Sequence, residues 1–320
     1  SSLFVGSVRC VFETDYKLEV YWYMPEIDGV IKKIAYAIRY HIFSVNGLGL
    51  IRYYPIHKTV YFFWSHFVPE YVLTDDHKIY LDSKDSLGLS INPHHEYEET
   101  MMIKQEVKEG NNVIDIGANI GYFTLLFAKL VGPNGKVFAF EPDPTNFSIL
   151  KKNIEENNYD NVILSQKAIS DKTETTKLFL CKFSNGMHRI YNSDLCDKSL
   201  DIESTTMDDF FSEINFKDKI NFIKIDTEGS EMKVLAGIEK ILESNDATIQ
   251  IEYNPSSIRE SGFSPKSLPD FLIKMGFDLM SFNRKLGKFK IISLTDLFEK
   301  YPETKNSFVN LFCKKNKKFN

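Results

Sequence analysis

The chain has 320 residues, of which 43% are hydrophobic, and this is enough to bury the core of one large domain with an added segment. Its net charge is −5 and its pI is about 5.9, which argues against a globally basic, nucleic-acid-binding protein. The sequence has no run of about eighteen apolar residues, so no membrane span is expected. The first residues lack a signal-peptide pattern, and a cytoplasmic protein is therefore expected.

The cysteines are scattered and show neither a C-x-x-C pattern nor metal-ligand spacing. They are Cys10, Cys181, Cys196 and Cys313. Such thiols are expected to be reduced in a cytosolic protein, while a disulfide pair stays open as the alternative.

Residues 1–68 are rich in aromatic side chains and carry no recognisable motif. Asp28 and Gly29 precede a predicted helix from Val30 to about Phe43, with apolar residues at helical spacing. The favoured interpretation is an N-terminal extension or subdomain packed on the core. A homodimer contact, an acceptor-binding surface and a surface for a lipid-linked substrate are the alternatives.

Residues 69–320 are expected to form the main domain, which begins with a hairpin at Tyr71–Leu81 and a helix from Glu96 to Val107. From residue 111 onward strands and helices alternate, which predicts a parallel sheet with helical crossovers. The expected strands are 113–116, 136–140, 161–164, 176–181, 200–204, 220–225, 247–251, 277–282 and 308–313. The expected helices are 122–130, 145–157, 209–214, 230–242 and 267–275. A polar stretch, residues 183–198, has neither pattern and is interpreted as a lid or substrate loop.

The most informative stretch is residues 113–122, an apolar strand with Asp115 near its end, followed by a turn and the start of a helix. The turn contains Gly117, Asn119 and Gly121. The next apolar strand ends on Glu141, about twenty residues beyond the turn, as nucleotide-binding strand–turn–helix units require.

The turn also indicates which nucleotide would bind. Asn119 replaces the middle glycine of a dinucleotide fingerprint, and the Asp115 carboxylate would repel a pyrophosphate. The same carboxylate suits the ammonium group or the sulfonium of S-adenosylmethionine. Gly117 and Gly121 would let the backbone approach this cofactor, and Glu141 would accept hydrogen bonds from its ribose hydroxyls. Methyl transfer is therefore favoured, with an NAD-dependent oxidoreductase and a non-catalytic S-adenosylmethionine-binding module as alternatives.

Several separated motifs, in the same order along the chain, resemble those of the FkbM family of S-adenosylmethionine-dependent methyltransferases. They occupy residues 113–124, 132–144, 153–154, 222–231 and 251–255. The resemblance runs from about Tyr71 to Cys313. It implies an α/β, class I (Rossmann-like) methyltransferase fold, with a seven-stranded, mostly parallel sheet flanked by helices. It also implies O-methylation of a small-molecule or glycan acceptor, at a hydroxyl of a sugar, a glycan or a secondary metabolite.

The resemblance assigns donor-binding roles to individual residues. It places four residues at the methionine end of the cofactor, namely Asp115, Gly117, Asn119 and Gly121. It places Glu141 at the ribose, and Ala168 or Ile169 against the adenine. No nucleic-acid partner is expected, because the chain is acidic and lacks an interleaved basic and aromatic stripe.

An alcohol is a poor nucleophile, so a general base or a metal ion must take or polarise its proton. Asp226 is the first candidate base and Glu228 the second, because both follow the end of a predicted strand. Glu228 could instead be an acid that only interacts with a helix dipole. His188 in the polar stretch is a third candidate, and His94 and His95 are further histidines near the expected site.

Asp226, Glu252 and Asn254 also predict a possible Mg²⁺ site, because all three supply oxygen atoms near the ends of adjacent strands. Such an ion would orient a sugar diol. Purely structural hydrogen bonding by these side chains is the alternative interpretation.

Overall fold

The computed structural model describes residues 68–90, 92, 95–181, 184–283, 286–304 and 307–316. The predicted N-terminal extension lies outside these residues, apart from Val68, and so do its predicted helix and any dimer contact made by it. Cys10 and His94 also lie outside the described residues.

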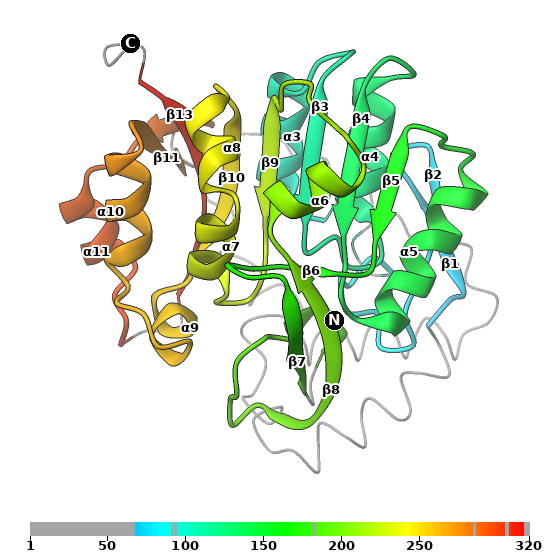
Figure 1. Ribbon diagram of the computed structural model, residues 1–320, viewed down its shortest axis with the longest axis horizontal. Coiled ribbons are helices and arrows are strands. Elements are labelled where there is room, and N and C mark those ends of the chain that lie inside the picture. The colour runs from blue at the N-terminus through cyan, green and yellow to red at the C-terminus, as the bar shows by residue number, and fades with distance from the viewer. Residues whose placement is uncertain are drawn as a thin grey trace, which may run out of the picture.

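A central sheet organises the described part of the chain, and within that part it has eight strands in the order β12-β11-β13-β10-β9-β3-β4-β5 (Figure 1). Their bounds are β3 (Asn112–Ile116), β4 (Lys136–Phe140), β5 (Val162–Ser165), β9 (Phe222–Ile225), β10 (Thr248–Tyr253), β11 (Phe277–Asn283), β12 (Lys288–Ile291) and β13 (Val309–Lys315). Strands β10, β9, β3, β4 and β5 are parallel, whereas β13 lies antiparallel between β10 and β11. The α/β fold with a mostly parallel sheet that was expected from the sequence is therefore present.

The expected seven strands of the sheet are therefore present, and β12 is an eighth that the sequence did not predict. It pairs antiparallel with β11 at the edge of the sheet, where the side chains of Lys288, Lys290 and Ile291 are exposed. An edge strand with exposed lysines has little of the apolar alternation that identifies buried strands.

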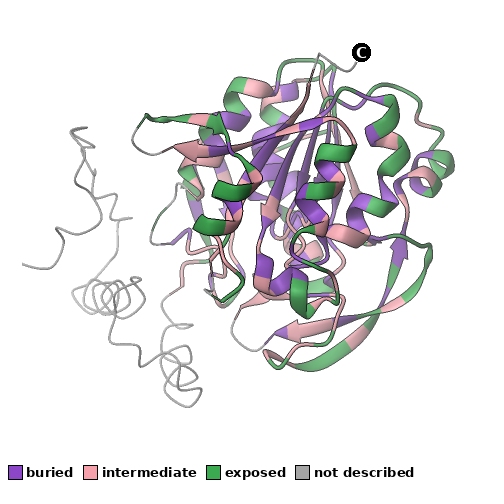
Figure 2. Cartoon of the chain, turned by 90° about the vertical axis from the view of Figure 1, so that its left-hand side faces the viewer, coloured by how far each residue is buried: buried purple, intermediate pink, exposed green. Residues whose placement is uncertain are grey.

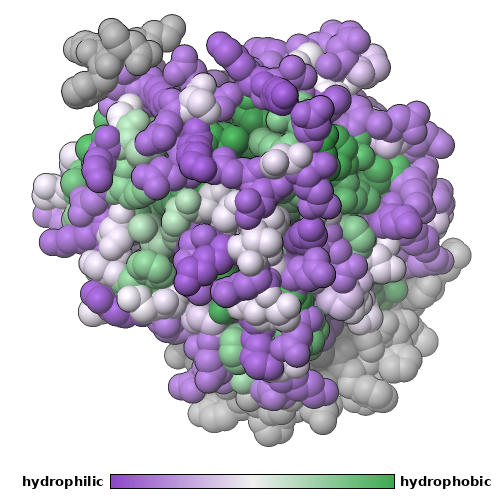
Figure 3. Space-filling view, viewed as in Figure 1, coloured by the Kyte–Doolittle hydropathy of each residue, from purple (hydrophilic) through white to green (hydrophobic). Residues whose placement is uncertain are grey.

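Helices cover both faces of the sheet, and one apolar cluster fills each interface (Figures 1 and 2). One cluster contains side chains of α3 (Tyr97–Glu106), α4 (Tyr122–Val131), α5 (Pro144–Glu156) and the hairpin β1 (Tyr71–Thr74)–β2 (His77–Tyr80). The other contains side chains of α6 (Met207–Glu213), α7 (Glu231–Gly237), α8 (Glu239–Ser244), α9 (Pro255–Glu260), α10 (Ser267–Lys274) and α11 (Leu294–Lys300). The strands are largely buried between them, while hydrophilic residues cover much of the outer face in Figure 3.

The predicted helix 230–242 is wrong as a single helix, because α7 ends at Gly237 and α8 begins at Glu239. A side chain at Gly237 would clash with the backbone carbonyl of Ser170, so glycine permits a close approach at the point where the helix is interrupted. The sequence analysis also missed α9 and α11. The Asn254 side chain accepts a hydrogen bond from Ser257 N at the start of α9, and Pro255 occupies its first turn, which is a recognisable helix start.

A small three-stranded sheet, β6 (Ala168–Ile169)–β8 (Cys196–Thr205)–β7 (Glu174–Cys181), projects below the central sheet in Figure 1. The predicted polar loop contains the 3₁₀ turn η2 (Asn185–Met187) and the beginning of β8. The structure joins Cys181 to Cys196 by a disulfide, so the expectation of reduced thiols is wrong for this pair. Cys313 is free and buried.

Within the part of the chain that the structure describes, none of the helices has both the length and the apolar character needed to cross a bilayer.

The fully buried side chain of Asn153 on α5 makes hydrogen bonds to β2 and to the turn before α4. Its Nδ2 donates hydrogen bonds to Ile120 O at 2.7 Å and to Tyr80 O at 3.1 Å, and its Oδ1 accepts one from Tyr80 N at 2.7 Å. Helix α5 thereby holds both the β2 strand and the turn that precedes α4.

We expect Asn153→Ala to lower the free energy of unfolding by about 3 kcal/mol, because it leaves buried backbone groups of Ile120 and Tyr80 without partners. Urea denaturation measures this change. The control is Asn192→Ala at an exposed position, which should change the free energy by less than about 0.5 kcal/mol. Equal losses in the two variants would contradict the assigned role.

Candidate active site

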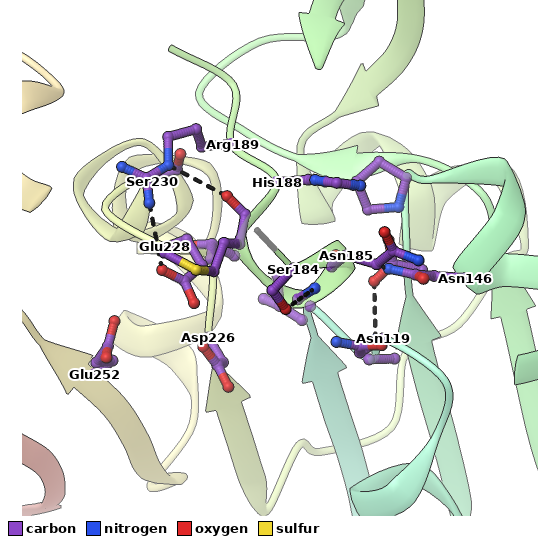
Figure 4. Close-up of a pocket in the computed structure, with 18 of the residues that line it drawn as sticks. Asn119, Asn146, Ser184, Asn185, His188, Arg189, Asp226, Glu228, Ser230 and Glu252 are labelled. Carbon is purple, nitrogen blue, oxygen red and sulfur yellow. Dashed lines mark hydrogen bonds and ion pairs between the residues drawn. The ribbon is translucent and has the colours of Figure 1, made fainter. Parts of the chain in front are cut away.

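A cavity of about 570 Å³ opens at the carboxyl ends of the central parallel strands (Figure 4). One half is lined by predicted donor-binding residues that follow β3 and β4. The other half is lined by acidic residues that follow β9 and lie on β10. Ligands of parallel α/β sheets bind at this edge, so the structure brings the two predicted groups of residues into one site.

The half lined by the predicted donor-binding residues is called the donor half. Asp115 lines it and is fully buried. Its Oδ2 accepts a hydrogen bond of 2.7 Å from the Thr124 hydroxyl, whereas its Oδ1 has no hydrogen-bond partner among the described residues. Burial raises the pKa of Asp115, and the Lys224 ammonium opposes that shift. A buried carboxylate oxygen without a partner that lines a cavity fits a cationic ammonium group, as the sequence predicted.

Gly117 and Gly121 have different roles. Both adopt positive φ angles, +82° and +95°. A side chain at Gly117 would clash with the backbone carbonyl of Asp226, so this glycine lets the turns after β3 and β9 approach each other. Gly121 directly precedes α4, and a Cβ there would lie 2.6 Å from Leu150 Cδ1. Gly117 lines the cavity, and Gly121 does not.

Glu141 is buried at the end of β4, and both its carboxylate oxygens are held by the backbone. Oε2 accepts a hydrogen bond from Asn119 N at 2.8 Å, and Oε1 accepts one from Asp143 N at 2.9 Å. Burial raises the pKa of Glu141 to about 8. A carboxylate accepts about four hydrogen bonds, so two acceptor positions are left for ribose hydroxyls. Asn119 also lines the cavity, and its Oδ1 has no partner among the described residues.

Ala168 and Ile169, the two residues of β6, also line the cavity. They are 6% and 2% exposed, and they give this part of the wall an apolar surface. Such a surface suits the flat face of a purine, and the adenine contact that the resemblance implied stays a prediction.

The other half, which we call the acceptor half, contains the predicted catalytic acids Asp226 and Glu228, with Glu252 beside them on the neighbouring strand (Figure 4). Asp226 Oδ2 lies 2.9 Å from the Lys224 ammonium. Burial, followed by the charge of Asp226, raises the pKa of Glu228 to about 8, although Arg189 opposes this shift. Burial, followed by the charge of Glu228, also raises the pKa of Glu252 well above its usual value.

Lys224, which was not singled out from the sequence, also lines the cavity, and so does Glu96. Lys224 is 3% exposed on β9, and a lysine within the otherwise apolar strand 222–225 was a usable signal. Glu96 adopts a positive φ of 45° before α3. Burial, followed by the charge of Asp226, raises the pKa of Glu96 to about 8.

The described candidate histidines, His95 and His188, also line the cavity. His188 Nδ1 accepts a hydrogen bond from Cys181 N at 3.1 Å, and its Nε2 lies 3.8 Å from Asp143 Oδ2, on the donor side. Burial lowers the pKa of His188. His95 packs edge-on against Tyr122, with ring centroids 5.5 Å apart, and burial lowers its pKa to about 4.

The possible Mg²⁺ site is not supported by the arrangement of its three predicted ligands. Asp226 is paired with Lys224, and Asn254 Oδ1 accepts hydrogen bonds from Ser257 N and Ser256 Oγ at 3.2 and 2.9 Å. Over the described ranges, no group of three or more His, Cys, Asp or Glu side chains is arranged to hold a metal ion.

We expect Gly117→Ala to abolish binding of S-adenosylhomocysteine, measured by titration calorimetry, because the new methyl group displaces the carbonyl of Asp226. Gly276→Ala is the matched control. Gly276 has a similar φ of +84°, but a Cβ there would have no atom within 4 Å. Both substitutions cost backbone strain of about 1–2 kcal/mol, but only the first changes the site. Unchanged affinity in Gly117→Ala would contradict the assigned close approach.

The pKa of Glu252 predicts how stability depends on pH. Folding raises this pKa above its ordinary value of 4.5, so the resulting stabilisation is present below that value and is lost as the pH rises through the folded pKa. Glu252→Gln removes the ionisation and should raise the Tm of the ligand-free protein at about pH 8 by roughly 2–4 °C, with no gain near pH 5.

Glu303→Gln is the control for this measurement. A hydrogen bond from Arg259 lowers the pKa of Glu303, so its replacement should not raise the Tm at the higher pH. If Glu252→Gln has the same Tm as the wild-type protein at both pH values, ionisation of Glu252 does not destabilise the folded protein and the prediction is wrong.

Three relatives illustrate what the chain is similar to. Methyltransferase 1 of Beauveria bassiana is 26% identical over 185 residues, which cover 52% of this chain and 74% of that protein. The 31-O-demethyl-FK506 methyltransferase FkbM of Streptomyces tacrolimicus is 29% identical over 163 residues, which cover 42% of this chain and 62% of that protein. The hexuronic acid methyltransferase AglP of Haloferax volcanii is 26% identical over 186 residues, which cover 57% of this chain and 71% of that protein.

A model of the methyltransferase FkbM domain matches residues 115–279, just over half of the chain. The matched region begins at the buried carboxylate of the donor half and includes the acids of the acceptor half. It also includes most of the strands that carry the cavity. The chain belongs to the FkbM family of S-adenosylmethionine-dependent methyltransferases.

Proposed function

We propose that the protein is an O-methyltransferase whose acceptor is a hydroxyl group of a sugar, a glycan or a secondary metabolite. The observation that carries this proposal is the single cavity in which the donor half adjoins carboxylates able to accept a hydroxyl proton. Two relatives support it by their names, since one acts on an oxygen of demethyl-FK506 and the other on hexuronic acid. Membership of a methyltransferase family removes the NAD-dependent oxidoreductase that the sequence left as an alternative.

When bound, S-adenosylmethionine supplies an electrophilic methyl group, so the protein must orient the acceptor oxygen and remove its proton. Glu228 is our preferred general base, because a pKa of about 8 lies close to neutral pH, where a base is most effective. Asp226, held by Lys224 at 2.9 Å, is placed to accept a hydrogen bond from a second acceptor hydroxyl. This reverses the ranking that the sequence suggested for the two acids.

The donor half holds the cofactor through groups already positioned by the fold. The free oxygen of Asp115 would accept from the ammonium group, and the backbone-held carboxylate of Glu141 from the ribose. Because these acceptors are fixed by hydrogen bonds before the cofactor binds, little ordering is required on binding.

We expect Glu228→Gln to lower turnover by a factor of about 10²–10⁴, the usual contribution of a positioned general base, while the affinity for S-adenosylhomocysteine changes little. The assay incubates the protein with S-adenosylmethionine and a panel of unmethylated glycosides and identifies O-methyl products by mass spectrometry. Glu299→Gln, on the exposed surface of α11, is the control and should retain full turnover.

Two outcomes would contradict the proposal. Methyl transfer to nitrogen, sulfur or carbon by the wild-type protein would refute the O-methylation. Full turnover in Glu228→Gln would remove Glu228 as the base, in which case Asp226→Asn tests the other acid. S-adenosylhomocysteine should also raise the Tm, whereas NAD should not.

A further inference from the structure

Residues 184–191, which we call the bridging segment, run along the cavity from the donor half to the acceptor half (Figure 4). The segment follows β7 and contains η2. It is fastened to the small sheet by paired hydrogen bonds between Arg189 and Phe179, at 2.8 and 3.2 Å. Its two ends make different kinds of contact.

The donor end of the bridging segment is held mainly by hydrogen bonds of Asn185, including one of 3.4 Å from its Nδ2 to Asp82 Oδ1. Asn185 N donates to Ser86 Oγ at 3.1 Å, and Asn146 Nδ2 donates to Asn185 O at 3.1 Å. Gly186 packs on the donor turn so closely that a Cβ there would lie 3.1 Å from Asn119 Nδ2. The segment therefore covers the turn that contacts the cofactor.

The acceptor end is held by charge. Arg189 is 3% exposed, and its Nη2 lies 3.6 Å from Glu228 Oε2, while its Nη1 lies 3.3 Å from Glu260 Oε2. The same Nη1 donates to the Tyr191 hydroxyl at 3.0 Å, and that hydroxyl donates to the backbone carbonyl of Glu228 at 2.9 Å. The Arg189 guanidinium thus joins the bridging segment to α9 and to the side chain of Glu228. Through the Tyr191 hydroxyl it is also linked to the backbone of Glu228.

We propose that Arg189 is a positioning residue that holds the bridging segment over the donor site and fixes Glu228 at the acceptor end. The second part rests on the proposed function, because it takes Glu228 as the base. Through this one side chain, the placement of the bridging segment over the donor half and the placement of Glu228 are linked.

The two terminal nitrogens of the guanidinium group explain why an arginine, and not a lysine, is needed at position 189. Its separate nitrogens reach Glu228 and Glu260 simultaneously, whereas the single ammonium of a lysine pairs with one carboxylate at a time. Removing the charge leaves two neighbouring carboxylates without their shared cation, and truncating one partner of a buried charge pair is costly. The bridging segment then keeps the hydrogen bonds at its donor end and the backbone pair with Phe179, but loses its ionic contacts with Glu228 and Glu260.

The test compares amide hydrogen exchange of residues 184–191 in the full chain with bound S-adenosylhomocysteine, using mass spectrometry of peptides. In Arg189→Met we expect exchange in this segment to become faster by about tenfold or more, and the Kd for S-adenosylhomocysteine to rise by about tenfold. Arg189→Lys should restore part of both properties, which a purely steric role would not allow.

Arg259→Met is the matched control, because Arg259 lies beside Glu260 on α9 and pairs with Glu303 at an exposed position. It should leave exchange in residues 184–191 and the Kd unchanged. The proposal is overturned if Arg189→Met behaves like this control, if exchange accelerates uniformly over the domain, or if Arg189→Lys is no better than Arg189→Met.

If Arg189→Met does not fold, Glu260→Gln replaces it. Glu260 is 48% exposed, and its loss should still accelerate exchange in the segment by about twofold to threefold. An unchanged rate overturns the proposal. The exchange experiment needs no acceptor, so its result does not depend on the proposed O-methylation. It can contradict the role of Arg189 without contradicting O-methylation. Conversely, the absence of O-methyl products would refute the proposed function and leave the exchange result valid.

Discussion

The buried ammonium of Lys224 is the interaction on which the rest of the site depends. The register of β3 and β9 places Lys224 opposite Asp115, and its Nζ lies 2.9 Å from Asp226 Oδ2. Burial opposes its charge, but the carboxylates of Asp226, Asp115 and Glu96 raise the pKa of Lys224 above its ordinary value. Because several acids surround one cavity, a shared cation limits the cost of burying them. The donor and acceptor halves are thus one electrostatic unit, although they come from different strands.

The donor half could be predicted from the sequence because its main residues lie in one stretch, from β3 to the end of β4. Strand, turn, helix and strand are local patterns, and the sign of the charge at Asp115 distinguishes the cofactor from a dinucleotide. The convergence of Asp226 and Glu252 was also predictable, because carboxyl ends of parallel strands share one edge of a sheet. The functions of Gly117 and Gly121 could not be separated, since this depends on contacts with Asp226 and Leu150 elsewhere in the chain.

What the sequence could not predict depends on long-range placement. Arg189 and Glu260 are 71 positions apart, and nothing in the polar stretch around Arg189 indicates which acid it meets. The interruption after α7 depends on Gly237 approaching Ser170, and the disulfide depends on β7 and β8 pairing. By contrast, two features could have been predicted from local sequence. They are Lys224, a charged residue in an apolar strand, and the start of α9 at Asn254 and Pro255.

The position of β13 has a consequence for how the domain is assembled during synthesis. This strand, the last of the sheet in chain order, lies between β10 and β11, so β10 keeps an unpaired edge until residues 309–315 have left the ribosome. The strands of the donor half are complete long before that point. The donor half can therefore assemble first on the growing chain, and the acceptor half is closed last.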